Sequence, residues 1–337
     1  MKKRIFTSLF FLLSLFVSQG VDALTISPPI IEVNGDPGTR LTGTVTVYNE
    51  TTDDQVFYTS FENFEPGEDS GVPHFIGNQD GLATWLAAES EIFLKAGERK
   101  EVPFSVTIPV EVDPGGYFSA VFFGDQPPVQ TPGTVAIGGR LGVLVLLRVN
   151  GDIPEDAGLV EFGTRDGKFF YDTLPVNFEY RFSNKGGDRV VPRGEIEITN
   201  TFGSKRGLLD ANTVGGNVLP DSVRRFSTSW LISDSEMFEL LTKKDLTEDE
   251  RDLLPGFFDK VSAQWKNFAI GWYTADLYLG WGTDGQVARD SVSFLIVPWQ
   301  LLIVLFVLVT LVRVVIRFFL KWYKKRLLQQ IREQNID

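Results

Sequence analysis

The chain lacks the residues on which most catalytic and metal sites depend. Its 337 residues include no cysteine and a single histidine, His74, which we interpret as a solvated loop residue. Without cysteine there is neither a disulfide nor a thiolate nucleophile, so an exported domain must be stable through its core alone. One histidine cannot provide the histidine pair of a zinc site, and no glycine-rich phosphate loop follows an expected strand. We therefore expect a protein that is not an enzyme and that uses no metal and no cofactor.

Long apolar runs occur at the two ends of the chain. At the start, the basic residues 2–4 precede the apolar run Ile5–Val17. Val21 and Ala23 then place small residues at the minus-three and minus-one positions of a cleavage site. This order predicts a secretory signal peptide over residues 1–23.

The second apolar run, near the carboxyl end, predicts a transmembrane helix over residues 298–320. Such a helix extends roughly 34 Å at about 1.5 Å per residue, enough to cross a hydrocarbon core of about 30 Å. Arg313 and Arg317 would share one face, and they either extend toward the lipid head groups or pair with another membrane helix. The expected membrane-anchor residues are Trp299, Arg313, Arg317, Lys321, Lys324, Lys325 and Arg326.

Charge divides the chain in the same way. Residues 24–297 carry 41 acidic and 22 basic side chains, a net charge of −19, whereas residues 298–337 carry 7 basic and 2 acidic ones. Positive charge marks the cytosolic side of a membrane segment. We therefore expect a single-pass type I protein of the cell membrane, with an extracytoplasmic body and a basic cytoplasmic tail over residues 321–337. A body this acidic repels phosphate backbones, which argues against nucleic acid as a partner.

The first part of the body, residues 24–155, alternates apolar and polar side chains with the period of a β-strand. The alternation is clearest in Thr44–Tyr48, Phe104–Ile108 and Val143–Val149. Turns that contain glycine and proline separate these stretches. About seven short strands without an amphipathic helix predict an immunoglobulin-like β-sandwich.

The second part, residues 156–297, repeats this pattern. Val176–Phe182 and Tyr273–Trp281 alternate, and Asn184–Asp188 and Thr283–Gln286 have the composition of hairpin turns. A second β-sandwich domain follows from these signals. The fold class is therefore all-β: two immunoglobulin-like β-sandwich domains, with one transmembrane helix at the carboxyl end.

One segment of the second domain departs from the β pattern. Apolar residues recur at helical spacing within residues 233–267, and Thr247 and Glu250 form a capping box. We expect a helical insertion here. It either packs its apolar stripe onto the sheet next to the membrane or offers a docking surface to a partner.

Short motifs follow one another in a characteristic order between residues 24 and 155. They are Ile26–Pro29, Pro37–Gly38, Val45–Asn49, Gly81–Trp85, Val110–Phe118, Arg140–Gly142 and Gly151–Ile153. In this order they resemble the peptidoglycan-binding domain of the WxL-interacting proteins of bacterial cell envelopes. The resemblance implies an outer sandwich that binds the cell wall, a second sandwich, and a membrane helix with a basic tail.

If a glycan is bound, exposed aromatic rings should stack on the sugar faces while polar groups fix their orientation. The candidate ligand-binding residues are Asp80, Trp85, Tyr117 and Arg140. Trp85 fits a place in the core as well as a stacking platform. Arg140 fits an ion pair with a carboxylate as well as a ligand contact.

These observations favour a non-enzymatic, membrane-anchored protein of the bacterial cell envelope. Its outer sandwich is expected to bind peptidoglycan or another cell-surface glycan, cell-surface proteins, or both. The alternative is an envelope adhesin or scaffold that binds only protein partners and no glycan.

Overall fold

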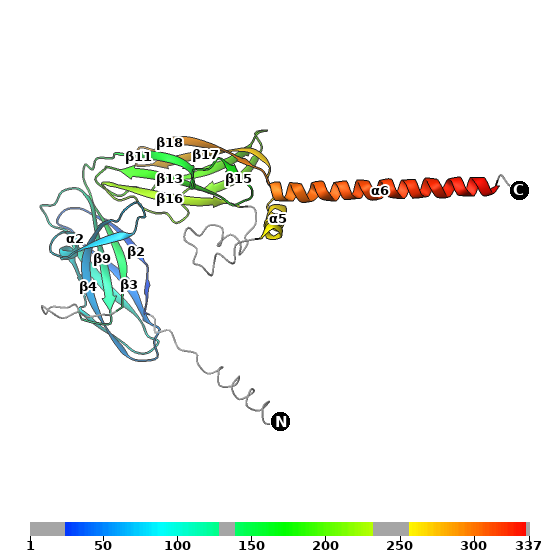
Figure 1. The fold of residues 1–337 in the computed structure, drawn as a ribbon. Helices are drawn as coiled ribbons and strands as arrows, with labels where there is room; N and C mark the ends of the chain where they lie inside the picture. Colours follow the sequence, from blue (N-terminus) through cyan, green and yellow to red (C-terminus); the bar gives the residue numbers. More distant parts are fainter. Residues whose placement is uncertain (1–23, 128–138, 232–255, 335–337) are drawn as a thin grey trace, which may run out of the picture. The chain divides into compact units, whose positions relative to one another are not determined.

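The computed structural model describes residues 24–127, 139–231 and 256–334, with 327–334 as backbone only (Figure 1). The expected signal peptide and the capping box at Thr247 and Glu250 lie outside these ranges. The chain divides into two compact units. The first unit contains the residues up to Ala157 together with the segments Asn184–Val190 and Asn217–Val223, and the second contains Gly158–Ser183, Val191–Gly216 and the chain from Arg224 onward.

The described part of the first unit is a sandwich of two sheets with one short helix, α2 (Gly81–Trp85). Its strands are β1 (Leu24–Ser27), β2 (Ile30–Gly35), β3 (Arg40–Asn49), β4 (Gln55–Pro66), β5 (Pro73–Gly77), β6 (Leu86–Ala88), β7 (Glu91–Leu94), β8 (Arg99–Thr107), β9 (Gly115–Gly124) and β10 (Arg140–Val149). One sheet has the order β1-β3-β8-β6. The other has the order β2-β10-β9-β4-β5, with β7 also paired to β4.

The apolar positions of the alternating strands meet between these two sheets. Val45, Val47, Phe104, Val106, Val143, Val145 and Leu147 are each at most 3% exposed and belong to one core cluster. Because successive residues of a strand point to opposite faces, each of these strands covers the core with every second side chain. The alternation predicted from the sequence is confirmed at these strands.

Pro28 and Pro29 carry the chain from one sheet to the other. Before them, β1 pairs with β3 in antiparallel fashion, with Leu24 opposite Asn49. After them, β2 pairs with β10 in parallel fashion, with Ile30 opposite Leu144. Within the described chain both β1 and β2 are edge strands, where a proline without an N–H group interrupts no hydrogen-bond ladder.

The second unit is also a sandwich of two sheets. Its strands are β11 (Ala157–Thr164), β12 (Phe170–Tyr171), β13 (Val176–Asn184), β14 (Arg193–Asn200), β15 (Lys205–Asp210), β16 (Ser222–Trp230), β17 (Gly271–Trp281) and β18 (Gln286–Ile296). The sheet orders are β11-β13-β16 and β12-β18-β17-β14-β15. Phe178, Phe182 and Leu277 are fully buried between the sheets, again as the alternation predicts.

Three details of the β structure differ from the expectation. The turn at Thr283–Gln286 does join a hairpin, β17 to β18, but Asn184–Asp188 does not, because β13 and β14 lie in different sheets. The described part of the first unit has ten strands rather than about seven. Residues 81–85 form one helical turn where we expected no helix.

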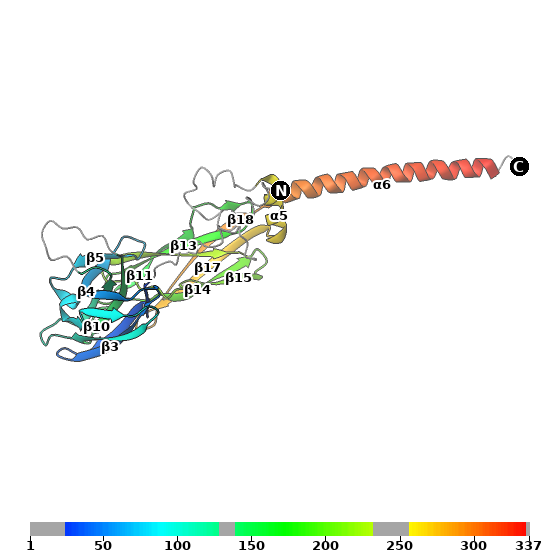
Figure 2. The ribbon, with the colours of Figure 1, turned by 90° about the horizontal axis from the view of Figure 1, so that it is seen from below.

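The structure describes two helices in the second unit. The helix α5 (Phe257–Lys266) is the described part of the expected insertion over residues 233–267. The helix α6 (Trp299–Gln334) continues past Leu320 through most of the expected tail, and its Trp299–Arg326 portion is long and apolar enough to cross a membrane. Both views show α5 beside the first turns of α6 (Figures 1 and 2). The predicted fold class, mostly β with two immunoglobulin-like sandwiches, a helix in the second and a long apolar carboxyl-terminal helix, is confirmed.

Candidate functional site

Trp85 and Tyr117 form an aromatic pair at the margin of the first core. Trp85 ends α2 and Tyr117 lies near the start of β9, and their ring centroids are 4.7 Å apart. Both rings are partly buried against the core cluster. The Tyr117 hydroxyl donates a hydrogen bond of 2.9 Å to the backbone oxygen of Asp113, and burial, together with the charge of Asp113, raises the pKa of Tyr117. A ligand could therefore reach only part of each ring.

Asp80 lies at the other end of the same short helix and is exposed. Its backbone oxygen accepts a hydrogen bond of 2.7 Å from Nδ2 of Asn63, a buried residue of β4. The Asn63 Oδ1 atom in turn accepts a hydrogen bond of 2.8 Å from the backbone amide of Ala83. One buried asparagine thus fastens the helical turn that carries Asp80 and Trp85, a role that the sequence alone did not reveal.

Arg140 forms an ion pair rather than a free ligand contact. It begins β10, and both terminal nitrogens of its guanidinium bind the carboxylate of Glu62 on β4. Its Cζ atom lies 4.1 Å from the centroid of the Phe122 ring on β9, the strand between them. The cation is therefore held by a carboxylate and by an aromatic face together.

The four candidates do not converge on one site. Tyr117 packs toward the core between the sheets, as do Val121 and Phe123 of the same strand. Phe122 and Arg140 lie on the outer face of that sheet, because odd and even positions of β9 point in opposite directions. The structure brings Asp80, Trp85 and Tyr117 together around α2 and places Arg140 on the other face.

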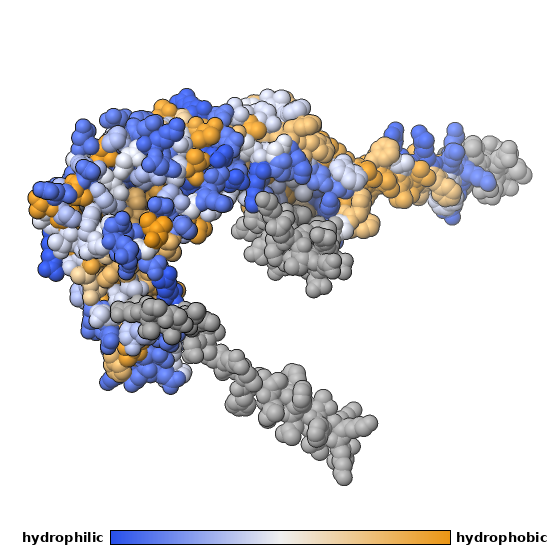
Figure 3. Space-filling model, turned by 60° about the vertical axis from the view of Figure 1, so that its left-hand side comes forward, coloured by the Kyte–Doolittle hydropathy of each residue, from blue (hydrophilic) through white to orange (hydrophobic). Residues whose placement is uncertain are grey.

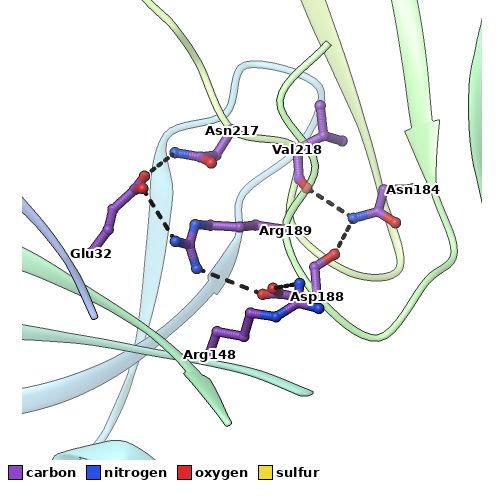
Figure 4. Close-up of polar contacts among 7 residues, drawn as sticks. All are labelled: Glu32, Arg148, Asn184, Asp188, Arg189, Asn217 and Val218. Carbon is purple, nitrogen blue, oxygen red and sulfur yellow. Dashed lines mark hydrogen bonds and ion pairs between the residues drawn. The ribbon is translucent and has the colours of Figure 1, made fainter. Parts of the chain in front are cut away.

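A buried polar cluster in the first unit was not anticipated from the sequence (Figure 4). Arg148 of β10 binds the Asp188 carboxylate at 2.8 Å, and Arg189 lies 3.7 Å from the other oxygen of the same carboxylate. Arg189 also binds Glu32 of β2 at 3.2 Å. The side chains of Asp188 and Arg189 are only 7% and 11% exposed, so the charges are neutralised with little solvent.

Asparagine side chains hold the loops of this polar cluster in place. Nδ2 of Asn184 donates to the backbone oxygens of Asp188 and Val218, at 2.8 and 2.9 Å, and its Oδ1 accepts from the amide of Gly186. Asn217 donates to Glu32 at 3.4 Å. The arrangement is a network of ion pairs and amide hydrogen bonds, in which Oδ1 of Asp188 and Nη1 of Arg189 are buried without a hydrogen bond and face each other as an ion pair at 3.7 Å.

His74 is exposed, as expected, but it lies in the edge strand β5 opposite Glu65 and not in a loop. Among the residues that the structure describes, no group of three His, Asp or Glu side chains is arranged to hold a metal ion.

A buried polar contact joins α6 to the rest of the second unit. The side chains of Gln264 on α5 and Gln300 on α6 are hydrogen bonded, and Oε1 of Gln264 accepts from the backbone amide of Leu301 at 2.9 Å. Nε2 of Gln300 also donates to Asp172 at 3.1 Å, and Lys260 lies 3.7 Å from the same carboxylate. The start of α6 is thereby fixed to the sandwich from two sides.

The expected anchor residues all lie on α6. Trp299 is its first residue, with its ring centroid 6.3 Å from that of Phe257 on α5. Arg313 and Arg317 are exposed within the apolar stretch, and Lys321, Lys324, Lys325 and Arg326 follow it. Figure 3 shows α6 as mostly hydrophobic, with hydrophilic groups gathered toward its far end.

The described residues define a class of protein: two immunoglobulin-like β-sandwich units followed by one long apolar helix. No family model and no curated protein matches the chain. Among solved structures, the class 5 fimbriae chaperone CfaA is 14% identical, with 82% of this chain and 100% of that chain covered and a TM-score of 0.36.

Two further solved structures are also only distantly similar. The E. coli chaperone DraB is 10% identical over 81% of this chain and 97% of its own, with a TM-score of 0.33. A PapD-like domain of human CEP192 is 13% identical over 38% of this chain and 86% of its own, with a TM-score of 0.27. Similarity this distant identifies neither a family nor a function for the chain.

Proposed function

We propose that this protein is a non-enzymatic, single-pass anchored protein of the bacterial cell envelope that binds a wall or surface ligand through its first sandwich. The observation that carries the proposal is the junction with α6. Only Val297 and Pro298 separate the last strand from the apolar helix, and the buried contact between Gln264 and Gln300 fixes that helix to the second unit. A helix held in this way tethers the sandwich close to a membrane surface.

The charge distribution supports a type I orientation, with the acidic body outside the cytoplasm and the basic end of α6 inside. Protease added to intact cells should then digest the body and spare an epitope at the carboxyl terminus. A body that survives while the carboxyl-terminal epitope is lost would reverse the orientation. Digestion after membrane lysis serves as the control that both parts can be cleaved.

For the ligand we propose peptidoglycan or a related surface glycan. The support is the resemblance of residues 24–155 to the wall-binding domain of WxL-interacting proteins, together with the aromatic pair Trp85 and Tyr117. A sugar would stack on the part of each ring face that the core leaves accessible. Because the segments 184–190 and 217–223 belong to the first unit, binding should be tested with the full chain and not with residues 24–155 alone.

The test is retention of the detergent-solubilised full chain by purified sacculi. Retention above that of an unrelated protein of the same charge supports a wall ligand. Trp85→Ala should weaken retention, whereas Phe93→Ala, which removes a 53% exposed ring of β7, is the matched control. Because Trp85 also packs on the core, circular dichroism of the variant must show that it is folded.

A scaffold that binds proteins alone is the second candidate, and one observation favours it. Within the described chain the edge strand β2 has a neighbour, β10, on one side only. In a parallel pair, successive residues of a strand direct their backbone N–H and C=O groups alternately to the two sides of the strand. If Ile31 and Val33 bond to β10, the backbone groups of Ile30, Glu32 and Asn34 therefore face the open edge. Such an edge accepts an added strand from a partner.

The proline variant Asn34→Pro separates the two candidates. It removes one N–H group from the open edge and leaves the pairing with β10 intact. Loss of a captured protein partner with unchanged sacculus retention assigns the protein ligand to β2. If the variant keeps both the captured protein partner and its retention by sacculi, β2 is not a binding edge.

A further inference from the structure

The end of the second unit from which α6 leaves is unusually rich in exposed aromatic side chains. The strand register shows which segments meet there. Gly271, the first residue of β17, lies opposite Ile296, the last of β18, while Phe170 of β12 lies opposite Leu295. Asn200, the last residue of β14, lies opposite Tyr273. The segments that border these positions therefore surround the start of α6.

Each of these segments carries a large ring that is open to solvent. We define the aromatic collar as Phe169, Phe202, Phe258, Trp265, Phe268 and Trp272. Phe202 is 90% exposed, Phe258 78% and Trp265 68%, and the other three are exposed by half or more. Figure 3 shows hydrophobic atoms gathered where the sandwich meets the helix.

The opposite end of the same unit provides an internal comparison. Its connections that lie wholly within the second unit are the turn Gly282–Gly285 and the segment Ala211–Gly216, and neither contains an aromatic residue. The large apolar side chains exposed there are Val214 and Val287. Both ends are made of the same kind of strand connections, so the sandwich fold does not by itself call for exposed rings at one end.

Exposed rings in water are unfavourable, because each leaves a large apolar surface hydrated. The collar is continuous with the apolar surface of α6, and this continuity indicates what would cover it. Trp299 of α6 packs edge-on against Phe257 of α5, so the apolar surface of the helix passes into that of the collar. Lipid contacting the first turns of α6 would meet the collar residues next.

Lysines flank three of the collar rings, and two of them, Lys168 and Lys205, also pair with Asp166 at 3.0 Å and Glu197 at 3.3 Å. Lys266 follows Trp265, Lys168 precedes Phe169 and Lys205 follows Phe202 by three residues. Aromatic rings interleaved with lysine are characteristic of segments that lie at the level of lipid head groups. Tryptophan in particular places an apolar ring and an N–H donor at that depth.

We propose that the aromatic collar inserts into the head-group layer of the same membrane leaflet that α6 enters, so that the second unit is seated on the lipid and not only tethered to it. The proposal rests on the membrane anchoring proposed for α6. It predicts a sandwich with restricted tilt, held at the helix and at several loops around it.

The absence of cysteine makes the test simple, because a single introduced cysteine can be spin-labelled without any background. Full-length chains with Phe202→Cys or Phe258→Cys are reconstituted in nanodiscs of phosphatidylcholine and phosphatidylglycerol. Val287→Cys, 73% exposed at the opposite end of the unit, is the matched aqueous control, and Leu308→Cys reports on α6 itself. The measurement is the ratio of spin-label accessibility to oxygen and to a water-soluble nickel complex.

We expect the ratio at positions 202 and 258 to exceed that at position 287 severalfold and to approach that at position 308. Aqueous values at 202 and 258 with a lipid value at 308 would overturn the collar and leave the anchor standing. An aqueous value at 308 would remove the anchor, and the collar with it. A last outcome concerns nanodiscs that hold two chains. If the labels at position 202 show dipolar coupling and both reagents are excluded from them, the collar contacts a second copy of the chain, and the proposal is also overturned.

Discussion

The charge cluster around Asp188 offers a measurable test of what stabilises the first unit. Asp188→Asn keeps the size of the side chain but removes the negative charge that faces Arg148 at 2.8 Å and Arg189 at 3.7 Å. Breaking a buried pair on one side costs about 3–5 kcal/mol, because the remaining charge is left uncompensated. Arg148 is one third exposed, so water can partly replace the carboxylate, and we expect a loss of about 2–3 kcal/mol.

A double-mutant cycle isolates the pair from the rest of the cluster. Arg148→Met should cost less than Asp188→Asn, since Arg189 remains to balance Asp188. The two substitutions together should cost less than their sum, with a coupling energy of roughly 1–2 kcal/mol. Glu89→Gln, which breaks the exposed pair of Lys100 and Glu89, is the control and should cost at most about 0.5 kcal/mol.

Hydrogen exchange of the β9 and β10 amides is the appropriate assay, because it reports the opening free energy of the first unit within the full chain. Salt provides a second test, because it screens exposed ion pairs more strongly than buried ones. The coupling energy between Asp188 and Arg148 should persist in about 1 M salt, where exposed pairs lose their attraction. A coupling below about 0.5 kcal/mol, within the error of additivity, would show that the two charges are independent and refute the reasoning.

Three other substitutions follow from the geometry. Gly43→Ala would place a Cβ atom 2.4 Å from the buried ring of Phe104 and should destabilise the protein by about 1–3 kcal/mol in urea unfolding, whereas Gly163→Ala, whose Cβ meets nothing, should be silent. Burial and the charge of Asp210 raise the pKa of Tyr180 above that of an unfolded tyrosine, despite the opposing charge of Arg224, so stability should fall as the pH rises above about 10. Tyr180→Phe should flatten that alkaline decline in thermal melts, and an unchanged slope would contradict the assignment. Arg140→Met should cost about 0.5–1.5 kcal/mol, since both its ion pair and its contact with the Phe122 ring are partly exposed, and an equal loss in Glu62→Gln would assign most of it to the ion pair.

Local pattern was enough to predict the strands and their buried faces. Alternation fixes which side of a strand is apolar, and Val143, Val145 and Leu147 were identified as core positions for this reason. Turn chemistry was less informative. The glycines after Asn184 require a turn, but they do not determine whether the next strand joins the same sheet, and here it joins the other one.

Contacts between distant strands were beyond the sequence. The partner of Arg140, Glu62, lies 78 residues earlier, and only the register of β4, β9 and β10 brings the two together across Phe122. Asn63 could not be distinguished from a surface asparagine until the position of α2 was known. The pairing of Trp85 with Tyr117 also depends on tertiary packing, and it accounts for the part of each ring that is buried.

The junction at α6 combines these lines of reasoning. The first amides of any helix lack partners within the helix, and in hydrocarbon they cannot bond to water instead. Here the amide of Leu301 donates to the side chain of Gln264, and the amide of Leu302 donates to the carbonyl of Pro298.

A buried glutamine pair is unfavourable at a sandwich edge in water, because apolar groups could fill the same space at lower desolvation cost. It suits the membrane helix proposed for α6, because it would satisfy these backbone groups before the helix reaches lipid. Gln264→Leu should therefore loosen the start of α6, seen as faster hydrogen exchange at Leu301 and Leu302, while exchange in the middle of β17 stays unchanged. Equal protection of these two amides in the variant would show that the glutamine pair does not cap the helix.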